Sequence, residues 1–194
     1  MLTLSIRSQI GISLIFVLLM IITRGHHFAS LQNLLPGASW AIFFLAGVYL
    51  RSAWPLLAFF ALSWWLDLAA FIWGGASDFC LTPAYFFLLP AYTSLWLAGR
   101  WYAQQHQFAW RTFMPLSISI IAGLVLCELF SSGGFYFFSG RFEETTLIEF
   151  SERLIKFFPM YIESFLFYVG IVLMTHVAFA LEHKQIKFHS NING

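Results

Sequence analysis

Charged residues are scarce in this sequence. Only 10% of its 194 residues are Asp, Glu, Lys or Arg, whereas 60% are hydrophobic and 20% are aromatic. The mean hydropathy of +0.77 lies far above the range of soluble proteins. The scarcity of charge excludes a sizeable soluble domain, and the composition predicts an integral membrane protein.

Other absences narrow the functional classes. The net charge is only +1, which argues against nucleic acid as a partner. The chain has no G-x-x-x-x-G-K-[ST] motif and therefore no phosphate-binding loop of its own. If the protein transports a substrate at the expense of ATP, another subunit must hydrolyse it. No internal repeat or linker divides the sequence, which predicts one domain over residues 1–194.

The apolar segments predict an all-α bundle. A helix needs about 20 apolar residues to cross the hydrocarbon, so this length leaves room for five or six spans. The first segment starts with a basic residue like a secretion signal, but no small-x-small cleavage pattern follows Ile22, which favours an uncleaved helix. The second is short, and either crosses where the membrane is thin or begins within Leu31 to Leu35. Six transmembrane helices are predicted, at about 8–23, 38–50, 53–73, 83–101, 113–130 and 157–181.

The longest polar stretch lies before the last span. Its first part, Ser131 to Gly140, is rich in glycine and aromatic residues and predicts a loop. In its second part, Thr146 and Glu149 have the spacing of a capping box and precede an amphipathic helical pattern. This pattern fits a short amphipathic helix over the membrane in the fifth, outer loop. It also fits a long lead into the last span.

The basic residues predict the orientation. With six spans, six of the ten Lys and Arg residues lie on the side of the two termini and four on the other side, where acids accompany those of the last loop. Cytoplasmic loops carry an excess of Lys and Arg. Both termini are therefore predicted to be cytoplasmic, and the loops holding His26, Cys80 and Gly133 to be outside.

Three acids interrupt the apolar spans. Asp67, Glu128 and Glu163 are predicted at one level in the outer third of the bundle. Because an ionisable group in hydrocarbon is costly, they indicate a pocket open to the outside. Two alternatives remain: Glu128 reaches the interface beside Ser131 and Ser132, and Asp67 and Glu163 make interhelical hydrogen bonds. The aromatic residues predicted at this depth are Trp64, Trp65, Tyr85, Phe86, Phe135 and Tyr136.

The two cysteines, Cys80 and Cys127, are predicted near the outer face. A disulfide between them is one alternative, because an outer compartment permits disulfides. Otherwise Cys127 is a small apolar filler. Cys80 precedes a predicted helix N-terminus, whose dipole favours a thiolate. A closed zinc site needs about four ligands, which this loop lacks, and His26 and His27 are assigned to a solvated loop. A single thiolate suits a metal that arrives with most of its coordination filled, such as cobalt in a corrin ring.

The segment WWLDLAAFIWGGASDFCLTPAY carries a family resemblance. It resembles the cobalamin-binding BtuM family, which are solitary S-components of energy-coupling factor (ECF) transporters. Asp67, Cys80 and Tyr85 occupy the positions that these residue types have in that family. The resemblance extends over the whole chain in length and layout, and implies an S-component-like bundle. It implies that Cys80 is the axial cobalt ligand and that Asp67 and Tyr85 support it by hydrogen bonds. It also implies loss of cyanide from bound cyanocobalamin, with these three residues as the catalytic set. Because this reaction would accompany uptake, enzymatic activity is left open.

The resemblance further implies docking to an ECF energising module of two ATPases and a transmembrane scaffold. The small-xxx-small motif that S-components often carry on their first helix is represented only by Ser8, Gly11 and Ser13, on imperfect spacing.

The resulting prediction is a substrate-binding subunit for cobalamin (vitamin B12) in the bacterial inner membrane, with lipid and cobalamin as partners. One alternative is an intramembrane cysteine hydrolase or acyltransferase, with Cys80 as nucleophile and His26 or His27 as base. Another is a structural protein of the cell envelope. The predicted corrinoid contacts are Cys80, Asp67, Tyr85, Trp64, Phe86, Glu163 and Tyr136.

Overall fold

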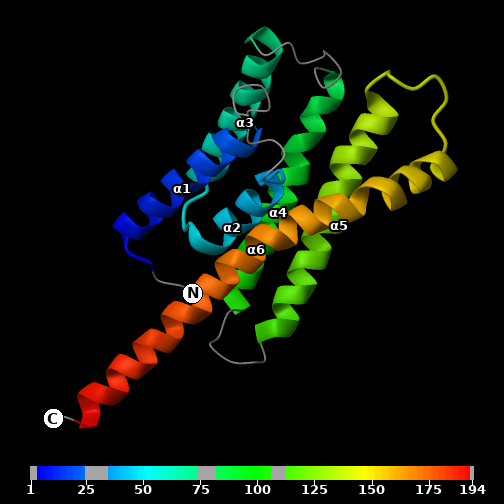
Figure 1. The fold of residues 1–194 in the computed structure, drawn as a ribbon. Coiled ribbons are helices and arrows are strands. Elements are labelled where there is room, and N and C mark those ends of the chain that lie inside the picture. Colours follow the sequence, from blue (N-terminus) through cyan, green and yellow to red (C-terminus); the bar gives the residue numbers. More distant parts are fainter. Residues whose placement is uncertain (1–3, 25–34, 74–81, 106–111, 193–194) are drawn as a thin grey trace.

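A computed structural model describes residues 4–24, 35–73, 82–105 and 112–192, with only the backbone described for residues 176–192. Over these ranges the protein is entirely helical, as predicted, and contains no strand (Figure 1). The elements are α1 (Ile6–Arg24), α2 (Ser39–Tyr49), α3 (Trp54–Trp73), the 3-10 helix η2 (Pro83–Phe87), α4 (Leu88–Gln105), α5 (Phe113–Phe138) and α6 (Leu147–Ile192).

Four of the described helices are long and apolar enough to cross a membrane. They are α1, α3, α5 and the part of α6 from Leu147 to Thr175, each with a strongly apolar stretch of 18 residues and few charges. The transmembrane character predicted from composition is therefore supported by the helices themselves. The remaining helices, α2 and α4, do not meet these criteria of length and composition.

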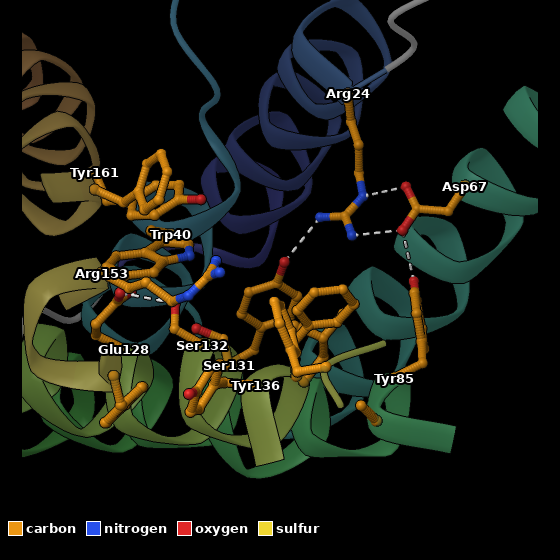
Figure 2. A pocket seen from close by; sticks show the side chains of 17 residues that line it. Arg24, Trp40, Asp67, Tyr85, Glu128, Ser131, Ser132, Tyr136, Arg153 and Tyr161 are labelled. Atoms are coloured by element: carbon orange, nitrogen blue, oxygen red, sulfur yellow. Dashed lines mark hydrogen bonds and ion pairs between the residues drawn. The ribbon is translucent and has the colours of Figure 1, made fainter. Parts of the chain in front are cut away.

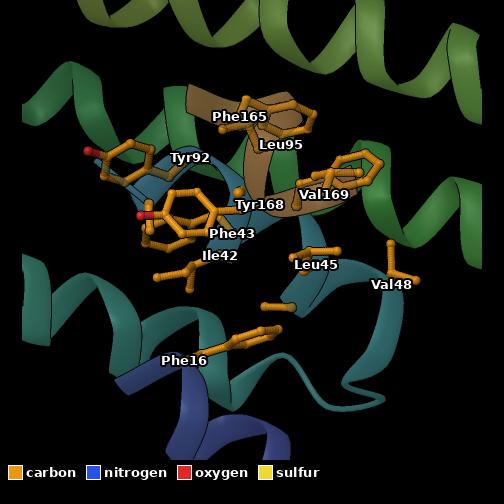
Figure 3. Packing of buried hydrophobic residues seen from close by; sticks show 14 of the residues in the cluster. Phe16, Ile42, Phe43, Leu45, Val48, Tyr92, Leu95, Phe165, Tyr168 and Val169 are labelled. Atoms are coloured by element: carbon orange, nitrogen blue, oxygen red, sulfur yellow. The ribbon is translucent and has the colours of Figure 1, made fainter. Parts of the chain in front are cut away.

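Helix α2 lies at the centre of the bundle. Every residue from Ala41 to Val48 is buried, and the helix packs against α1, α3, α4 and α6. Figure 3 shows Phe43 and Leu45 among side chains from the surrounding helices. The apolar residues on all sides of α2 are thus covered by protein and not by lipid. Its 11 residues rise about 16 Å, roughly half the thickness of the hydrocarbon, so this helix by itself is too short to cross it.

The start of α2 bears on one prediction from the sequence. The helix begins at Ser39, and residues 35–38 before it are not helical. The alternative in which this segment starts as early as Leu35 is therefore wrong, while residues 31–34 lie outside the described ranges.

Two glycines set the distance between α2 and α4. A Cβ atom added at Gly47 would overlap the backbone carbonyl of Trp96, and one added at Gly99 would overlap that of Phe44. The two backbones thus approach each other at a crossing that only glycine permits, as is common between membrane helices. Arg100, one residue further along α4, donates from Nη1 to the carbonyl of Leu50 at 2.7 Å and so satisfies the end of α2.

Helix α5 extends eight residues beyond the predicted end at Phe130. The prediction of a loop over Ser131 to Gly140 is wrong for most of its length, because Gly133 and Gly134 serve packing and not a turn. A Cβ at Gly134 would overlap the ring of Phe87 in η2, and one at Gly133 would contact Phe150 of α6. The helix ends at Phe138, and Gly140 just beyond it has a left-handed φ of 69°.

Helix α6 is continuous from Leu147 to Ile192, with Pro159 inside it. The predicted separate amphipathic helix in the fifth loop is therefore wrong, and the alternative of a long lead into the last span is correct. Half of the predicted capping box is present, because Oγ1 of Thr146 accepts a hydrogen bond from the backbone N–H of Glu149 at 3.2 Å. The other half is replaced, because the backbone N–H of Thr146 donates to the hydroxyl of Tyr136 and not to Glu149. In Figure 1, α6 crosses the bundle beside α2 and α5 and then runs past the other helices toward the C-terminus.

Candidate ligand-binding site

A cavity of about 740 Å³ lies where the end of α1, the start of α2 and parts of α3, η2, α4, α5 and α6 meet (Figure 2). Its wall is largely aromatic and includes Trp40, Phe135, Phe142, Phe150, Phe157 and Tyr161. The rings of Trp40 and Tyr161 are stacked with their centroids 5.0 Å apart, which joins α2 to α6 at the cavity. An aromatic wall with a few polar groups is typical of a small-molecule site.

An ion pair between Arg24 and Asp67 forms one side of the cavity. Arg24 donates from Nε to Oδ1 at 2.8 Å and from Nη2 to Oδ2 at 2.7 Å, so the carboxylate is held by both oxygens. The side chains are only 12% and 23% exposed, respectively. Such two-pronged pairs are strong and fix the orientation of both groups. The negative charge of Asp67 is therefore neutralised by Arg24 of α1, which explains how an acid is accommodated in an apolar helix.

Three hydroxyl groups complete this polar cluster. Tyr85 donates to Oδ2 of Asp67 at 2.7 Å, and Nη1 of Arg24 donates to Tyr92 and to Ser39, both at 2.9 Å. Figure 2 shows the guanidinium of Arg24 directed at Asp67, with Tyr85 bonded to the same carboxylate. The cluster links α1, α2, α3, η2 and α4 at the cavity. The interhelical hydrogen bonds considered for Asp67 are therefore present, and the same residue also lines the cavity.

Glu128 of α5 forms a second polar point. The residue is 2% exposed, and the hydroxyl of Ser132 donates to its Oε1 at 2.7 Å. The alternative in which Glu128 reaches the membrane interface is therefore wrong, because its side chain is buried and lines the cavity. Its Oε2 is buried and has no hydrogen-bond partner among the described residues.

The third polar point joins α5 to the start of α6. The hydroxyl of Tyr136 donates to Oε2 of Glu149 at 2.9 Å and accepts from the backbone N–H of Thr146 at 3.0 Å. Oε1 of Glu149 accepts from Arg153, whose guanidinium lies 4.5 Å from the centre of the Phe142 ring. Tyr136 and Arg153 both line the cavity, so the N-terminal turns of α6 are part of its wall.

Of the residues predicted from the sequence to bind a ligand, the structure brings Asp67, Tyr85 and Tyr136 together around this cavity. Trp64 and Phe86 line a second cavity of about 570 Å³, which shares Tyr85 and Leu88 with the first.

The other predicted residues are placed differently. Glu163 is exposed on α6 and is not among the residues that line either cavity, so its predicted role in binding remains a prediction. Cys80, His26 and His27 lie outside the described residues. Cys127 is a free thiol that is fully buried in the hydrophobic core, which agrees with a small apolar filler.

Sequence reasoning missed four polar residues of these clusters, Arg24, Ser39, Tyr92 and Arg153, and also the aromatic wall residues Trp40, Phe142, Phe150, Phe157 and Tyr161. In the sequence, Arg24 only marks the end of the first apolar segment, and Arg153 only belongs to the polar face of the amphipathic pattern. The available signal was electrostatic, because Asp67 in an apolar span requires a cation at its own level. Arg24 follows directly on the first span and is the basic residue nearest to that level.

Comparisons with protein-family models and with curated proteins find no match to this chain. The site therefore stands on its own geometry. Within the described ranges there is no group of three or more His, Cys, Asp or Glu side chains that could hold a metal ion. The chemistry that this geometry offers is the binding of a largely apolar or aromatic ligand with a few polar groups.

Proposed function

We propose that this protein is the substrate-binding membrane subunit of a cobalamin uptake system, a solitary S-component similar to the BtuM family. In this proposal it crosses the bacterial inner membrane six times with both termini in the cytoplasm. Cobalamin enters the cavity from outside, and the corrin ring lies against the aromatic wall.

The cavity is the observation that carries this proposal. Its wall is largely aromatic and is interrupted by a few polar side chains, among them Asp67, Tyr85 and Glu128. Corrin is a broad ring with apolar faces and with amide side chains around its edge. A wall of aromatic side chains interrupted by buried polar groups suits both parts of such a molecule.

The position of Cys80 in the sequence supports the choice of a cobalt-containing ligand. Cys80 lies between α3, which contributes Asp67 to the cavity, and η2, which contributes Tyr85. In the proposal its thiolate is the axial ligand of the cobalt, whose four equatorial positions are filled by the ring. Asp67 and Tyr85, which already share a hydrogen bond, orient groups beside that ligand.

The proposed loss of cyanide is a ligand exchange at cobalt. The thiolate of Cys80 supplies the electron pair of the new Co–S bond, and the Co–C bond breaks with its electron pair remaining on the departing cyanide. Cobalt keeps its oxidation state, and the cyanide takes a proton from water. The reaction accompanies uptake in this proposal.

Energy for transport comes from a partner in this proposal. The family resemblance implies an energising module of two ATPases and a transmembrane scaffold, and the chain itself has no phosphate-binding loop.

Visible absorption spectroscopy tests the proposal. The purified full-length protein is mixed with cyanocobalamin and freed from unbound vitamin. We expect a coloured protein with bands shifted from those of the free vitamin, and we expect Cys80→Ser to lose that shift. The matched control is Cys127→Ala, which removes the buried core thiol and should keep the shift. A wild-type protein that retains no corrinoid, or a Cys80→Ser variant with the affinity and spectrum of the wild type, would overturn the proposal.

A further inference from the structure

Glu128 lines the cavity and has one carboxyl oxygen without a hydrogen-bond partner among the described residues. Its carboxyl is fixed by Ser132 through Oε1, while Oε2 is buried without a partner among the described residues. A buried polar atom without a hydrogen-bond partner destabilises the folded protein relative to a paired one. Buried polar atoms of this kind are uncommon and require an explanation, such as a ligand that completes the hydrogen bond.

The other charged groups of the cavity already have partners in the protein. Arg24 is engaged through Nε, Nη1 and Nη2 with Asp67, Ser39 and Tyr92. Arg153 is engaged with Glu149. Glu128, which also lines the cavity, differs from these groups because Oε1 accepts from Ser132 while Oε2 has no partner among the described residues.

We propose that Glu128 is a specificity-determining residue that binds a primary carboxamide of the ligand through Oε2. This inference rests on the proposed function, because the corrin ring carries primary amides around its edge. The amide N–H donates to Oε2, while Ser132 holds the carboxyl in place.

The chemistry of the carboxyl favours an amide over a carboxylate. A primary amide has both a donor and an acceptor, so it pairs with an ionised carboxylate through its N–H and with a protonated carboxyl through its C=O as well. A carboxylate on the ligand has no donor, and it would place a second negative charge against the carboxyl of Glu128, a residue that is only 2% exposed.

Like charges at low dielectric repel strongly, so Glu128 selects against ligands in which this amide has been hydrolysed to a carboxylate. An ammonium group would have to be desolvated at greater cost than an amide.

The test compares cyanocobalamin with its monocarboxylic acids, which are obtained by mild acid hydrolysis of single edge amides. Dissociation constants are measured by isothermal titration calorimetry on the full-length protein. For at least one isomer we expect the wild type to bind the acid at least about tenfold more weakly than the parent, which is about 1.4 kcal/mol. Glu128→Gln, which keeps the shape and the oxygen that accepts from Ser132, should reduce this ratio to about twofold or less.

Two further variants sharpen the test. Glu152→Gln removes one negative charge from an exposed position on α6 and should keep the wild-type ratio. Ser132→Ala frees the carboxyl of Glu128 and should lower the ratio to a value between those of the wild type and Glu128→Gln, which provides a second readout if Glu128→Gln is poorly folded.

The outcomes separate this inference from the proposed function. If the wild type binds no corrinoid, the proposed function fails and this inference fails with it. If the wild type binds cyanocobalamin with the shifted spectrum but binds every monocarboxylic acid equally well, only the role of Glu128 is overturned. The same holds if Glu128→Gln and Ser132→Ala both keep the wild-type ratio.

Discussion

Arg24 at the end of α1 and Asp67 in the middle of α3 form a two-pronged ion pair, with Nε to Oδ1 at 2.8 Å and Nη2 to Oδ2 at 2.7 Å. The two residues are 43 positions apart in the sequence. Their pairing allows an acid to lie in an apolar helix, and it fixes the side of the cavity that Tyr85 also contacts.

Arg24→Met should destabilise the protein because it leaves Asp67 with only the hydroxyl of Tyr85. Removing one partner of a fully buried pair costs about 3–5 kcal/mol, and we expect less here because the Asp67 side chain is 23% exposed. Thermal unfolding in detergent, followed by tryptophan fluorescence, measures the effect. Arg7→Met, at an exposed position of the same helix, is the control.

The double variant Arg24→Met/Asp67→Leu completes this test. It removes both charges, so we expect it to be more stable than Arg24→Met alone. A double variant that loses the sum of the two single effects would show that the pair has no interaction energy.

Gly99→Ala should loosen the crossing of α2 and α4. The added methyl group overlaps the carbonyl of Phe44, and overpacking of this kind costs about 1–3 kcal/mol. The unfolding temperature should fall accordingly. Gly11→Ala adds the same methyl group to α1 where no atom lies within 4 Å, and should be neutral or slightly stabilising. Equal unfolding temperatures for the two variants would contradict the close approach.

Tyr136→Phe should weaken the start of α6. The change removes the hydroxyl that bonds both Glu149 and the backbone of Thr146, at a side chain that is 3% exposed. Loss of such a bond costs about 0.5–1.5 kcal/mol, and more where a charged group is involved. Hydrogen exchange of the backbone amides should rise over Leu147 to Arg153 and stay unchanged in α2. Unchanged exchange in the first turns of α6 would show that Tyr136 does not hold them.

Tyr85→Phe should weaken cobalamin binding if the proposed function is correct. The variant keeps the ring in the cavity wall and removes the hydrogen bond to Asp67, so we expect the dissociation constant to rise about 5- to 10-fold. Tyr168→Phe loses a comparable hydrogen bond, to the carbonyl of Pro36, outside the cavity lining and should bind as the wild type does. Calorimetric titration compares the two, and equal affinities would argue against a role of the Tyr85 hydroxyl.

The sequence alone determined the helical, membrane-embedded character of the chain and most helix boundaries. Long apolar runs have no other stable form in a bilayer, so α1, α3 and α5 start within two residues of the predicted positions. Asp67 could likewise be identified as a residue of a polar site, because an acid in an apolar span is costly wherever it lies.

Tertiary structure decided the partners and the exceptions. Gly133 and Gly134 could either turn the chain or make room for a neighbouring aromatic ring. The structure decides for the second, because Phe150 of α6 lies against Gly133 and Phe87 of η2 lies against Gly134. The pairing of Arg24 with Asp67 and the burial of Glu128 arise in the same way, since each depends on which helix faces which. Periodicity describes one helix at a time, whereas a cavity and its unpaired atoms exist only between helices.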